Sequence, residues 1–311
     1  MNIYPLNQIA SKPPEKFTTG IDYFDKVLDG GLVKSSTTLM AGMSGAGKSS
    51  LLTQVSYGIA ENGNRVLYIA GEESKEQIKM RTDRLAINSN LIFLYEEVEV
   101  SKVIEAIKEI NPELVIIDSM QMLYSNTIKT APATPTQMRY GLMTLCKLAK
   151  DDDLTIIFVG HSTKGGYVAG LQSFQHMVDV VLYLGINDDD TRFIKVNKNR
   201  FGQTGITTNL YMSKYGLFDT NDVIVPFGEI KKDRIFSLEE INKITEGQLI
   251  KPVIVASYKW LKKEAITNPN VNICNGTATL TSGKIKAITE GHLVWGKVVD
   301  YSMNWLLKHQ Q

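Results

Sequence analysis

The stretch Leu39-Met-Ala-Gly-Met-Ser-Gly-Ala-Gly-Lys-Ser-Ser50 carries the strongest structural signal in this chain. It contains the pattern G-x-x-x-x-G-K-[ST], with an apolar run before it and a helix-like run after it. A phosphate-binding loop needs this order of strand, loop and helix, because glycines let backbone N–H groups face a phosphate at the positive end of a helix. A glycine-rich turn that matches by accident is the alternative, and the flanking segments argue against it.

The residue types inside the loop predict a site for ATP and Mg²⁺. Lys48 would reach the β- and γ-phosphates, and the Ser49 hydroxyl would bind the metal ion. The other loop residues that we expect to contact the nucleotide are Gly42, Ser44, Gly45, Gly47 and Ser50.

The bulk composition is typical of a soluble enzyme. The 311 residues are 43% apolar, carry a net charge of +1 and include only two cysteines, Cys146 and Cys274. Their wide separation argues against a disulfide framework or a zinc ribbon. No apolar run is long enough to span a membrane, and the first residues lack the apolar core of a signal peptide. We therefore expect a cytoplasmic protein of one or two domains with no membrane partner.

Short apolar runs alternate with helix-like segments over most of the chain. The predicted strands are 38–41, 65–70, 92–95, 114–118, 155–160, 178–184 and 193–197. The predicted helices are 21–28, 48–62, 74–85, 100–110, 135–150 and 239–244. This alternation predicts an α/β fold with a mainly parallel central sheet. The strands between residues 178 and 210 have turn-like connections and predict an antiparallel extension.

The pattern changes near Gly228, which suggests three parts. Residues 1–16 hold three prolines and predict an extended arm, and residues 17–228 predict a P-loop core. Residues 229–311 carry 12 Lys/Arg against 8 Asp/Glu and predict a small C-terminal domain, either α+β or helical.

The C-terminal part offers three local patterns. A strand-like run at 252–256 precedes a basic helix-like segment at 258–265. Near the end, apolar residues recur at helical spacing, namely Val294, Val298, Tyr301 and Trp305. This helix would either pack on its own domain or dock a partner protein.

Acidic residues follow two of the predicted strands. Asp118 ends the apolar run 114–118 and is the candidate for holding Mg²⁺, since α/β sheets bind ligands at the carboxyl ends of their strands. Glu72 and Glu73 follow the strand 65–70, and either could accept the proton of an attacking water. We assign the base to Glu72 and keep Glu73 as the alternative, because Glu73 could merely favour the dipole of a helix.

Three further polar residues stand on or after later strands. His161 ends the strand 155–160 and would sense the γ-phosphate, or it is simply a satisfied histidine. Lys198 and Arg200 lie two apart on an extended segment and so point the same way. They would reach a phosphate of a neighbouring subunit, as arginine fingers do, or form a solvated basic turn.

Together, these segments resemble the core of the bacterial RadA/Sms ATPases of the RecA superfamily. The resemblance covers roughly residues 17–212, about two-thirds of the chain. Besides the P-loop, it is carried by Phe17-Thr-Thr-Gly-Ile-Asp, Gly71-Glu-Glu-Ser, Ile117-Asp-Ser-Met-Gln121, residues 131–139, Val159-Gly-His-Ser-Thr-Lys164, His176-Met-Val-Asp179 and Lys198-Asn-Arg-Phe-Gly202.

The resemblance implies a RecA-like ATPase that forms hexameric rings on single-stranded DNA and drives branch migration in recombination. It also implies that Lys198 and Arg200 of the family's signature pentapeptide act between subunits. The family's four-cysteine zinc module and its protease-like domain have no match here, so we expect a short form of the kind that phages carry. The C-terminal part would then take over the binding of a recombination or replication protein.

Two loops are the candidates for binding single-stranded DNA. The first, 124–137, holds Lys129, and the second, 164–174, holds Lys164, Tyr167 and Phe174. Lysine meets phosphate and aromatic rings stack on bases, and in a RecA-like ring both loops would face the central channel.

Three functions fit these features. The first is a DNA-dependent ATPase motor, a helicase or translocase of recombination, repair or replication, and the signature pentapeptide favours it. The second is a recombinase or annealing protein that forms ATP-switched filaments. The third is a KaiC-like signalling ATPase without DNA.

Overall fold

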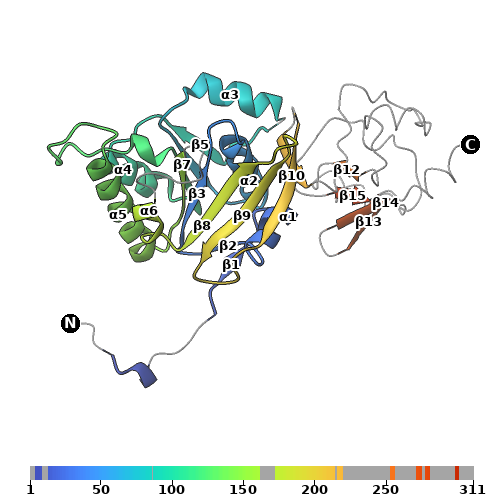
Figure 1. The fold of residues 1–311 in the computed structure, drawn as a ribbon, viewed down its shortest axis with the longest axis horizontal. Helices are drawn as coiled ribbons and strands as arrows, with labels where there is room; N and C mark the ends of the chain where they lie inside the picture. Colours follow the sequence, from blue (N-terminus) through green and yellow to red (C-terminus); the bar gives the residue numbers. More distant parts are fainter. Residues whose placement is uncertain are drawn as a thin grey trace, which may run out of the picture.

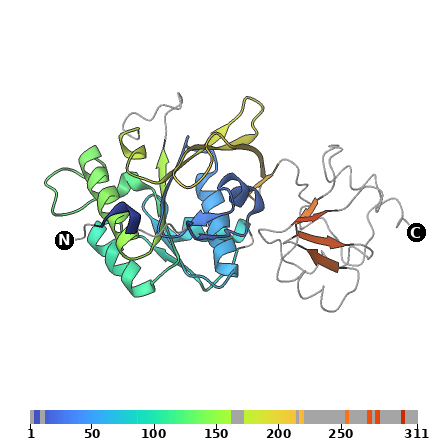
Figure 2. The ribbon, with the colours of Figure 1, turned by 90° about the horizontal axis from the view of Figure 1, so that it is seen from below.

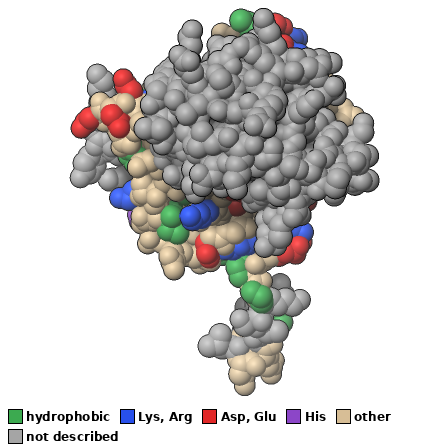
Figure 3. All heavy atoms as spheres, turned by 90° about the vertical axis from the view of Figure 1, so that its right-hand side faces the viewer, with side chains coloured by type: hydrophobic (Ala, Val, Ile, Leu, Met, Phe, Trp, Pro, Cys, Tyr) green, Lys and Arg blue, Asp and Glu red, His purple; other side chains and the backbone are tan. Residues whose placement is uncertain are grey.

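The structure, a computed structural model, describes most of the first 219 residues. It covers 4–8, 13–85, 87–161, 172–213 and 216–219, together with four short strands in the C-terminal part. Figure 1 shows these segments in sequence colours, with the short 3-10 helix η1 (Leu6–Gln8) standing away from the sheet. Figure 3 shows the described side chains of one face by chemical type.

A nine-stranded sheet forms the centre of the molecule (Figure 1). Its order is β11-β10-β9-β8-β3-β7-β6-β4-β5. The bounds are β3 (Thr37–Gly42), β4 (Val66–Ala70), β5 (Ile92–Tyr95), β6 (Leu114–Asp118), β7 (Thr155–His161), β8 (Val180–Ile186), β9 (Arg192–Asn199), β10 (Thr207–Ser213) and β11 (Gly216–Asp219). Across the sheet, all neighbours from β8 through β3, β7, β6 and β4 to β5 pair in parallel. Strands β9, β10 and β11 extend the sheet beyond β8 in antiparallel fashion. The predicted α/β fold with a mainly parallel sheet is therefore confirmed.

Helices cover both faces of the sheet (Figure 2). They are α1 (Asp22–Val27), α2 (Lys48–Glu61), α3 (Lys75–Arg84), α4 (Val100–Ile110), α5 (Pro135–Asp151) and the short α6 (Gln172–Gln175), with the 3-10 turn η2 (Met120–Met122). Alternate residues of the buried strands point to opposite faces. One set packs with α1 and α2, and the other packs with α4 and α5. Strands β1 (Lys16–Phe17) and β2 (Leu32–Val33) pair in antiparallel fashion and form a separate two-stranded sheet.

Local sequence explains where the helices begin. The Ser74 hydroxyl accepts from the Gln77 N–H while the Gln77 side chain accepts from the Ser74 N–H, which makes a capping box for α3. Thr134 caps α5, and Pro135 occupies its first turn. The strands and helices predicted between residues 21 and 197 lie within two residues of observed elements, whereas β1, β2, β10, β11 and α6 were not predicted as separate elements. The predicted helix 239–244 lies outside the described residues.

The C-terminal strands correct one prediction. Strands β12 (Val253–Val255), β15 (Val298–Asp300), β14 (Thr277–Leu280) and β13 (Val271–Cys274) form a second sheet in that order. The predicted strand 252–256 corresponds to β12. The helix expected around Val298 is wrong at residues 298–300, which pair with β12 in antiparallel fashion. Adjacent β-branched valines favour a strand there, and the pairing outweighs the helical spacing. The predicted helix 258–265 and the boundary at Gly228 lie outside the described residues.

No helix that the structure describes combines the length and apolar character that a membrane span requires.

Gly58 allows α2 to pack closely against the loop at Thr19. A Cβ atom built on Gly58 would lie 2.0 Å from the carbonyl oxygen of Thr19. Only hydrogen leaves room for this close approach of helix and loop.

This contact yields a stability prediction. By helix propensity alone, Gly58→Ala should stabilise the protein by about 1 kcal/mol. We expect the opposite, a loss of about 1–3 kcal/mol in the free energy of unfolding, because the carbonyl cannot move away freely. Urea unfolding followed by circular dichroism measures the change. Gly141→Ala in α5 is the matched control, since its nearest neighbours, at 3.0–3.3 Å, are side-chain atoms that can shift. An alanine variant at 58 that is more stable than the wild type would contradict this account.

Candidate nucleotide-binding site

The P-loop joins the end of β3 to the start of α2. A Cβ atom on Gly42 would lie 2.3 Å from the Leu184 carbonyl oxygen. Only glycine therefore fits at the point where the chain passes from β3 into the loop. Gly47 has a φ of +105° and precedes the first helical residue, Lys48. This backbone conformation favours glycine and turns the first N–H groups of α2 into the loop. The geometry is the one expected from the sequence pattern.

Lys48 is the buried cation of the loop. It is 4% exposed, and its Nζ donates to the carbonyl oxygens of Gly42 at 2.8 Å and Met43 at 2.9 Å. Burial lowers the pKa of this ammonium, and the negative charges of Asp118 and Glu72 oppose the shift. The loop carbonyls thus hold Lys48 within reach of an arriving phosphate.

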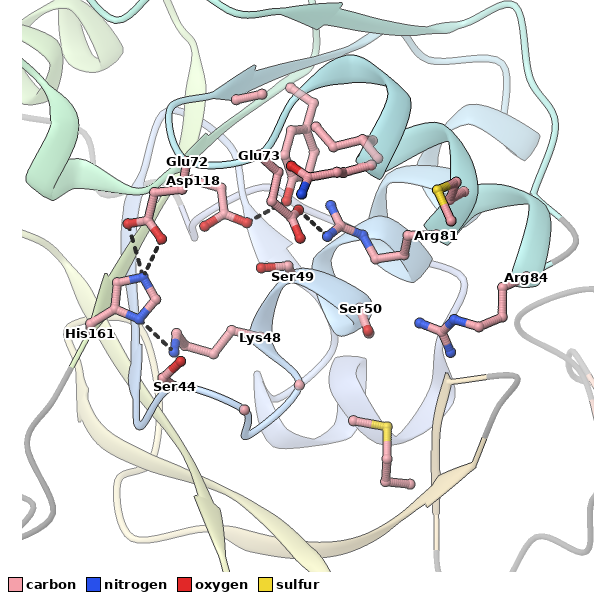
Figure 4. A pocket seen from close by; sticks show the side chains of 18 residues that line it. Ser44, Lys48, Ser49, Ser50, Glu72, Glu73, Arg81, Arg84, Asp118 and His161 are labelled. Carbon is pink, nitrogen blue, oxygen red and sulfur yellow. Dashed lines mark hydrogen bonds and ion pairs between the residues drawn. The ribbon is translucent and has the colours of Figure 1, made fainter.

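Neighbouring parallel strands bring the other predicted residues to the same edge. In the sheet order, β3, β7, β6 and β4 are adjacent, so their carboxyl ends meet at the P-loop. His161 pairs with Gly42, and Asp118 pairs with Ala70, two residues before Glu72. Figure 4 shows these side chains around one cavity of about 560 Å³.

The cavity gathers most of the predicted nucleotide-contacting residues. Those that line it are Ser44, Gly45, Gly47, Lys48, Ser49, Ser50, Glu72, Glu73, Asp118 and His161. Further lining residues, not singled out from the sequence, include Tyr68, Gln77, Met80, Arg81, Arg84 and Met212. Gly42 lies beside the cavity, as the residue whose carbonyl holds Lys48.

Glu72 lies at the centre of a polar network. Both of its carboxylate oxygens are 3.1 Å from Nε2 of His161, and the Ser119 hydroxyl donates to Oε1. Nδ1 of the same histidine is 3.3 Å from Nζ of Lys48 (Figure 4). Because an ammonium can only donate, Nδ1 accepts and Nε2 carries the proton toward Glu72. His161 therefore links Glu72 to the P-loop lysine.

Glu73 faces a different partner. Its Oε2 forms an ion pair with Nη1 of Arg81, whose side chain is 8% exposed. Nε of Arg81 donates to the Thr53 hydroxyl at 3.1 Å. This anchoring turns Glu73 toward α2 and α3, and it supports the choice of Glu72 as the base.

Ser49 and Asp118 offer the two oxygen donors that a magnesium ion would need from the protein. A hydroxyl and a carboxylate are hard oxygen ligands, and Mg²⁺ in phosphate sites uses one or two such groups together with substrate phosphates. The donor chemistry therefore fits the ion. Oδ2 of Asp118 accepts a hydrogen bond of 2.6 Å from the Tyr68 hydroxyl.

Lys198 and Arg200 lie at the other end of the sheet. Nζ of Lys198 donates to the carbonyl oxygens of Gln175 and Val178, at 2.9 and 2.6 Å. Nη1 of Arg200 pairs with Oδ1 of Asp179 at 2.9 Å, and Oδ2 of that aspartate accepts from Thr37 at the start of β3. The P-loop follows the end of β3, so both cations are remote from the nucleotide site of their own chain.

The predicted DNA-binding residues have separate outcomes. Lys129 is exposed, in a loop whose base is held by the Gln137 amide through three backbone carbonyls. Lys164 and Tyr167 lie outside the described residues. Phe174 is 2% exposed and packs in the core between the sheet and α5, so its prediction as a base-stacking residue is wrong. Burying a large aromatic ring stabilises the fold more than leaving the ring exposed on a loop.

Comparison with known proteins assigns the chain to a family. Residues 8–167, about half of the chain, match the family model described as AAA domain. The chain therefore belongs to this family, and its core has the RecA-like arrangement of a P-loop ATPase.

The more particular relatives are bacterial proteins named DNA repair protein RadA. The chain is 40% identical to that of Bacillus subtilis (strain 168) over 266 residues, which are 85% of this chain and 57% of the relative. It is 39% identical to that of Campylobacter jejuni over 233 residues, 75% of this chain and 52% of the relative. The chain thus spans about half the length of these relatives. The resemblance to a RadA-like ATPase core is confirmed.

Among solved structures, a KaiC-like protein of Pyrococcus horikoshii has the same fold. The TM-score is 0.55 with 19% identity, covering 67% of this chain and 99% of that protein. At this identity the similarity concerns the fold alone.

The contrast between the two glutamates can be tested directly. Glu72→Gln should bind ATP and hydrolyse it about 10²–10⁴-fold more slowly, because the amide keeps the shape and loses the basicity. Glu73→Gln, the matched control, should retain most activity, because this carboxylate is engaged by Arg81. Steady-state phosphate release measures both. An inactive Glu73→Gln beside an active Glu72→Gln would reverse the assignment.

Proposed function

We propose that this chain is an ATP-dependent motor on single-stranded DNA, a helicase or branch-migration translocase of recombination, repair or replication. The observation that carries the proposal is the gathering of Lys48, Ser49, Glu72, Asp118 and His161 around one cavity. The name of the relatives, DNA repair protein RadA, supports the DNA-directed role.

The hydrolysis step follows from the positions of the side chains. Lys48 would leave the Met43 carbonyl for the β- and γ-phosphates, and the bound Mg²⁺ would neutralise the phosphate charge that develops in the transition state. Glu72 would orient the attacking water and accept its proton. Lys48 and Glu72 both contact His161, so a γ-phosphate that arrived between them would disturb the contacts of the histidine first.

His161 is therefore proposed as the sensor of the γ-phosphate. His161 contacts Glu72 and Lys48 at once. A phosphate that attracts Lys48 removes the partner of Nδ1 and frees the ring to turn, which releases Glu72 toward water. His161 is the last residue of β7, so its position also bears on the chain that follows.

The DNA-binding role is proposed for Lys129, Lys164 and Tyr167. Phosphate contacts by lysine release counterions, so binding should weaken with salt. We propose a hexameric ring, in which these residues face the channel, with Lys198 and Arg200 acting across subunit boundaries. A recombination or replication protein bound by residues 229–311 completes the proposal.

Single-stranded DNA should bind at low salt and accelerate ATP hydrolysis. Lys164→Ala should reduce the slope of log K against log salt by about 0.7, the value expected for one lost phosphate contact. Tyr167→Ala should weaken binding by about 1–3 kcal/mol per stacked base. Fluorescence anisotropy with labelled oligonucleotide measures the binding, and phosphate release measures the stimulation.

Lys108→Ala on the exposed surface of α4 is the control for the loss of a surface charge. Absence of DNA binding at low salt, with ATP present, would contradict the motor and favour a signalling ATPase. Strand annealing without translocation would favour the filament-forming alternative.

The role of Arg200 between subunits calls for a mixing experiment. An arginine finger is worth about 10³–10⁵ in kcat, so Arg200→Ala should hydrolyse ATP very slowly while binding it normally. Lys48→Ala should also be inactive, through loss of its contacts with phosphate. Mixed assemblies contain some interfaces with both groups intact, so activity should partly return on mixing the two variants.

The control is a mixture of Lys48→Ala with Glu72→Gln, whose defects lie in the same pocket and should complement each other poorly. Mass photometry with differently sized tags establishes that subunits exchange. If exchange occurs and the Lys48→Ala and Arg200→Ala mixture stays inactive, the finger role is refuted.

A further inference from the structure

A buried polar layer lies behind Ser49 and Asp118, the two candidate magnesium ligands. Tyr68 is 2% exposed in the middle of β4, and its hydroxyl donates to Oδ2 of Asp118 at 2.6 Å across to β6. The two strands are neighbours, with Ala70 opposite Asp118, so Tyr68 comes two residues earlier on the same face. A buried tyrosine hydroxyl needs a partner, and here the partner is a carboxylate of the site.

This hydrogen bond restricts the last side-chain torsion of Asp118. The last torsion of an aspartate side chain is broad, so packing alone does not fix which oxygen faces the cavity. Magnesium, however, demands nearly ideal octahedral geometry. With Oδ2 engaged by Tyr68, Oδ1 is the oxygen that would remain for the ion.

The other candidate ligand, Ser49, is held through its backbone. The Thr53 hydroxyl donates to the Ser49 carbonyl oxygen at 2.7 Å, one turn along α2. That hydroxyl in turn accepts from Nε of Arg81, a buried side chain of α3. Arg81 thus connects α3 to the turn of α2 that carries Ser49.

We propose that Tyr68 is a positioning residue for the magnesium ion, which it serves by holding Asp118 in the orientation that the ion requires, with Thr53 and Arg81 supporting Ser49. Tyr68 acts through Asp118 and needs no contact with the nucleotide. It can act in this way only if the cavity binds Mg²⁺ and ATP, as proposed above. Outer partners of metal ligands typically contribute about 10–100-fold to metal affinity.

The test is the magnesium dependence of nucleotide binding by the full chain. Binding of mant-ATP, followed by fluorescence, is titrated with Mg²⁺ for the wild type and for Tyr68→Phe. A second titration uses EDTA. We expect Tyr68→Phe to raise the half-saturating Mg²⁺ concentration about 10–100-fold and to leave the affinity in EDTA unchanged.

Tyr57→Phe is the matched control. Tyr57 is also a buried tyrosine bonded to a carboxylate, Glu61, but it lies in α2 and does not line the cavity. The control should keep the wild-type Mg²⁺ dependence. Thr53→Val removes the other support without changing β4, and it should shift the Mg²⁺ dependence in the same direction even if Tyr68→Phe folds poorly.

Each result separates two claims. A wild type that binds mant-ATP without any effect of Mg²⁺ would contradict the proposed function itself. A Mg²⁺-dependent wild type with Tyr68→Phe unchanged would overturn the positioning role alone. Equal loss of affinity with and without Mg²⁺ would overturn it too, since it would show general damage to the cavity.

Discussion

The parallel pairing of four neighbouring strands is the constraint on which the site depends. Strands β3, β7, β6 and β4 lie side by side, so every residue that follows a carboxyl end arrives at the same edge. The sheet needs apolar side chains on both faces through most of each strand, so the charged side chains of the site lie at the strand ends or just beyond them. The P-loop lysine, Asp118, His161 and Glu72 are therefore near one another as a consequence of the core. Their hydrogen bonds then refine the geometry that the pairing imposes.

The opposite edge of the sheet carries a second polar cluster. Asp179 joins the start of β3 to Arg200, while Lys198 donates to the carbonyl oxygens of Gln175, at the end of α6, and of Val178. Burial, followed by the charge of Arg200, lowers the pKa of Lys198, which is what a partly enclosed cation should show. Lys198 is partly buried, whereas the Arg200 side chain is 48% exposed, so the finger role and the solvated basic turn both remain as predictions. The contacts place both cations beside the segment 172–179, which follows the residues where Lys164 and Tyr167 stand.

The sequence was sufficient to predict the fold because apolar runs and capping residues mark nearly every element of the core. The P-loop and the acids after the strands were predictable for the same reason, since topology alone brings strand ends together. Tyr68 was missed because it stands inside an apolar run, where a tyrosine looks like core, although a buried tyrosine hydroxyl usually has a hydrogen-bond partner. Arg81 was missed because pairing across helices depends on packing that sequence spacing does not contain. Phe174 and Val298 were misassigned because tertiary burial and strand pairing outweighed local pattern.

We propose above all that one cavity holds Mg²⁺ and ATP, and that a bound γ-phosphate releases Glu72 from His161. A crystal structure with Mg²⁺ and a non-hydrolysable ATP analogue tests this most directly. The account predicts Lys48 on the phosphates, Ser49 and Asp118 at the metal ion, and Glu72 turned from His161 toward a water in line with the γ-phosphate. An analogue bound elsewhere, or one bound in the cavity with Glu72 still on His161 and no water beside it, would contradict the claim.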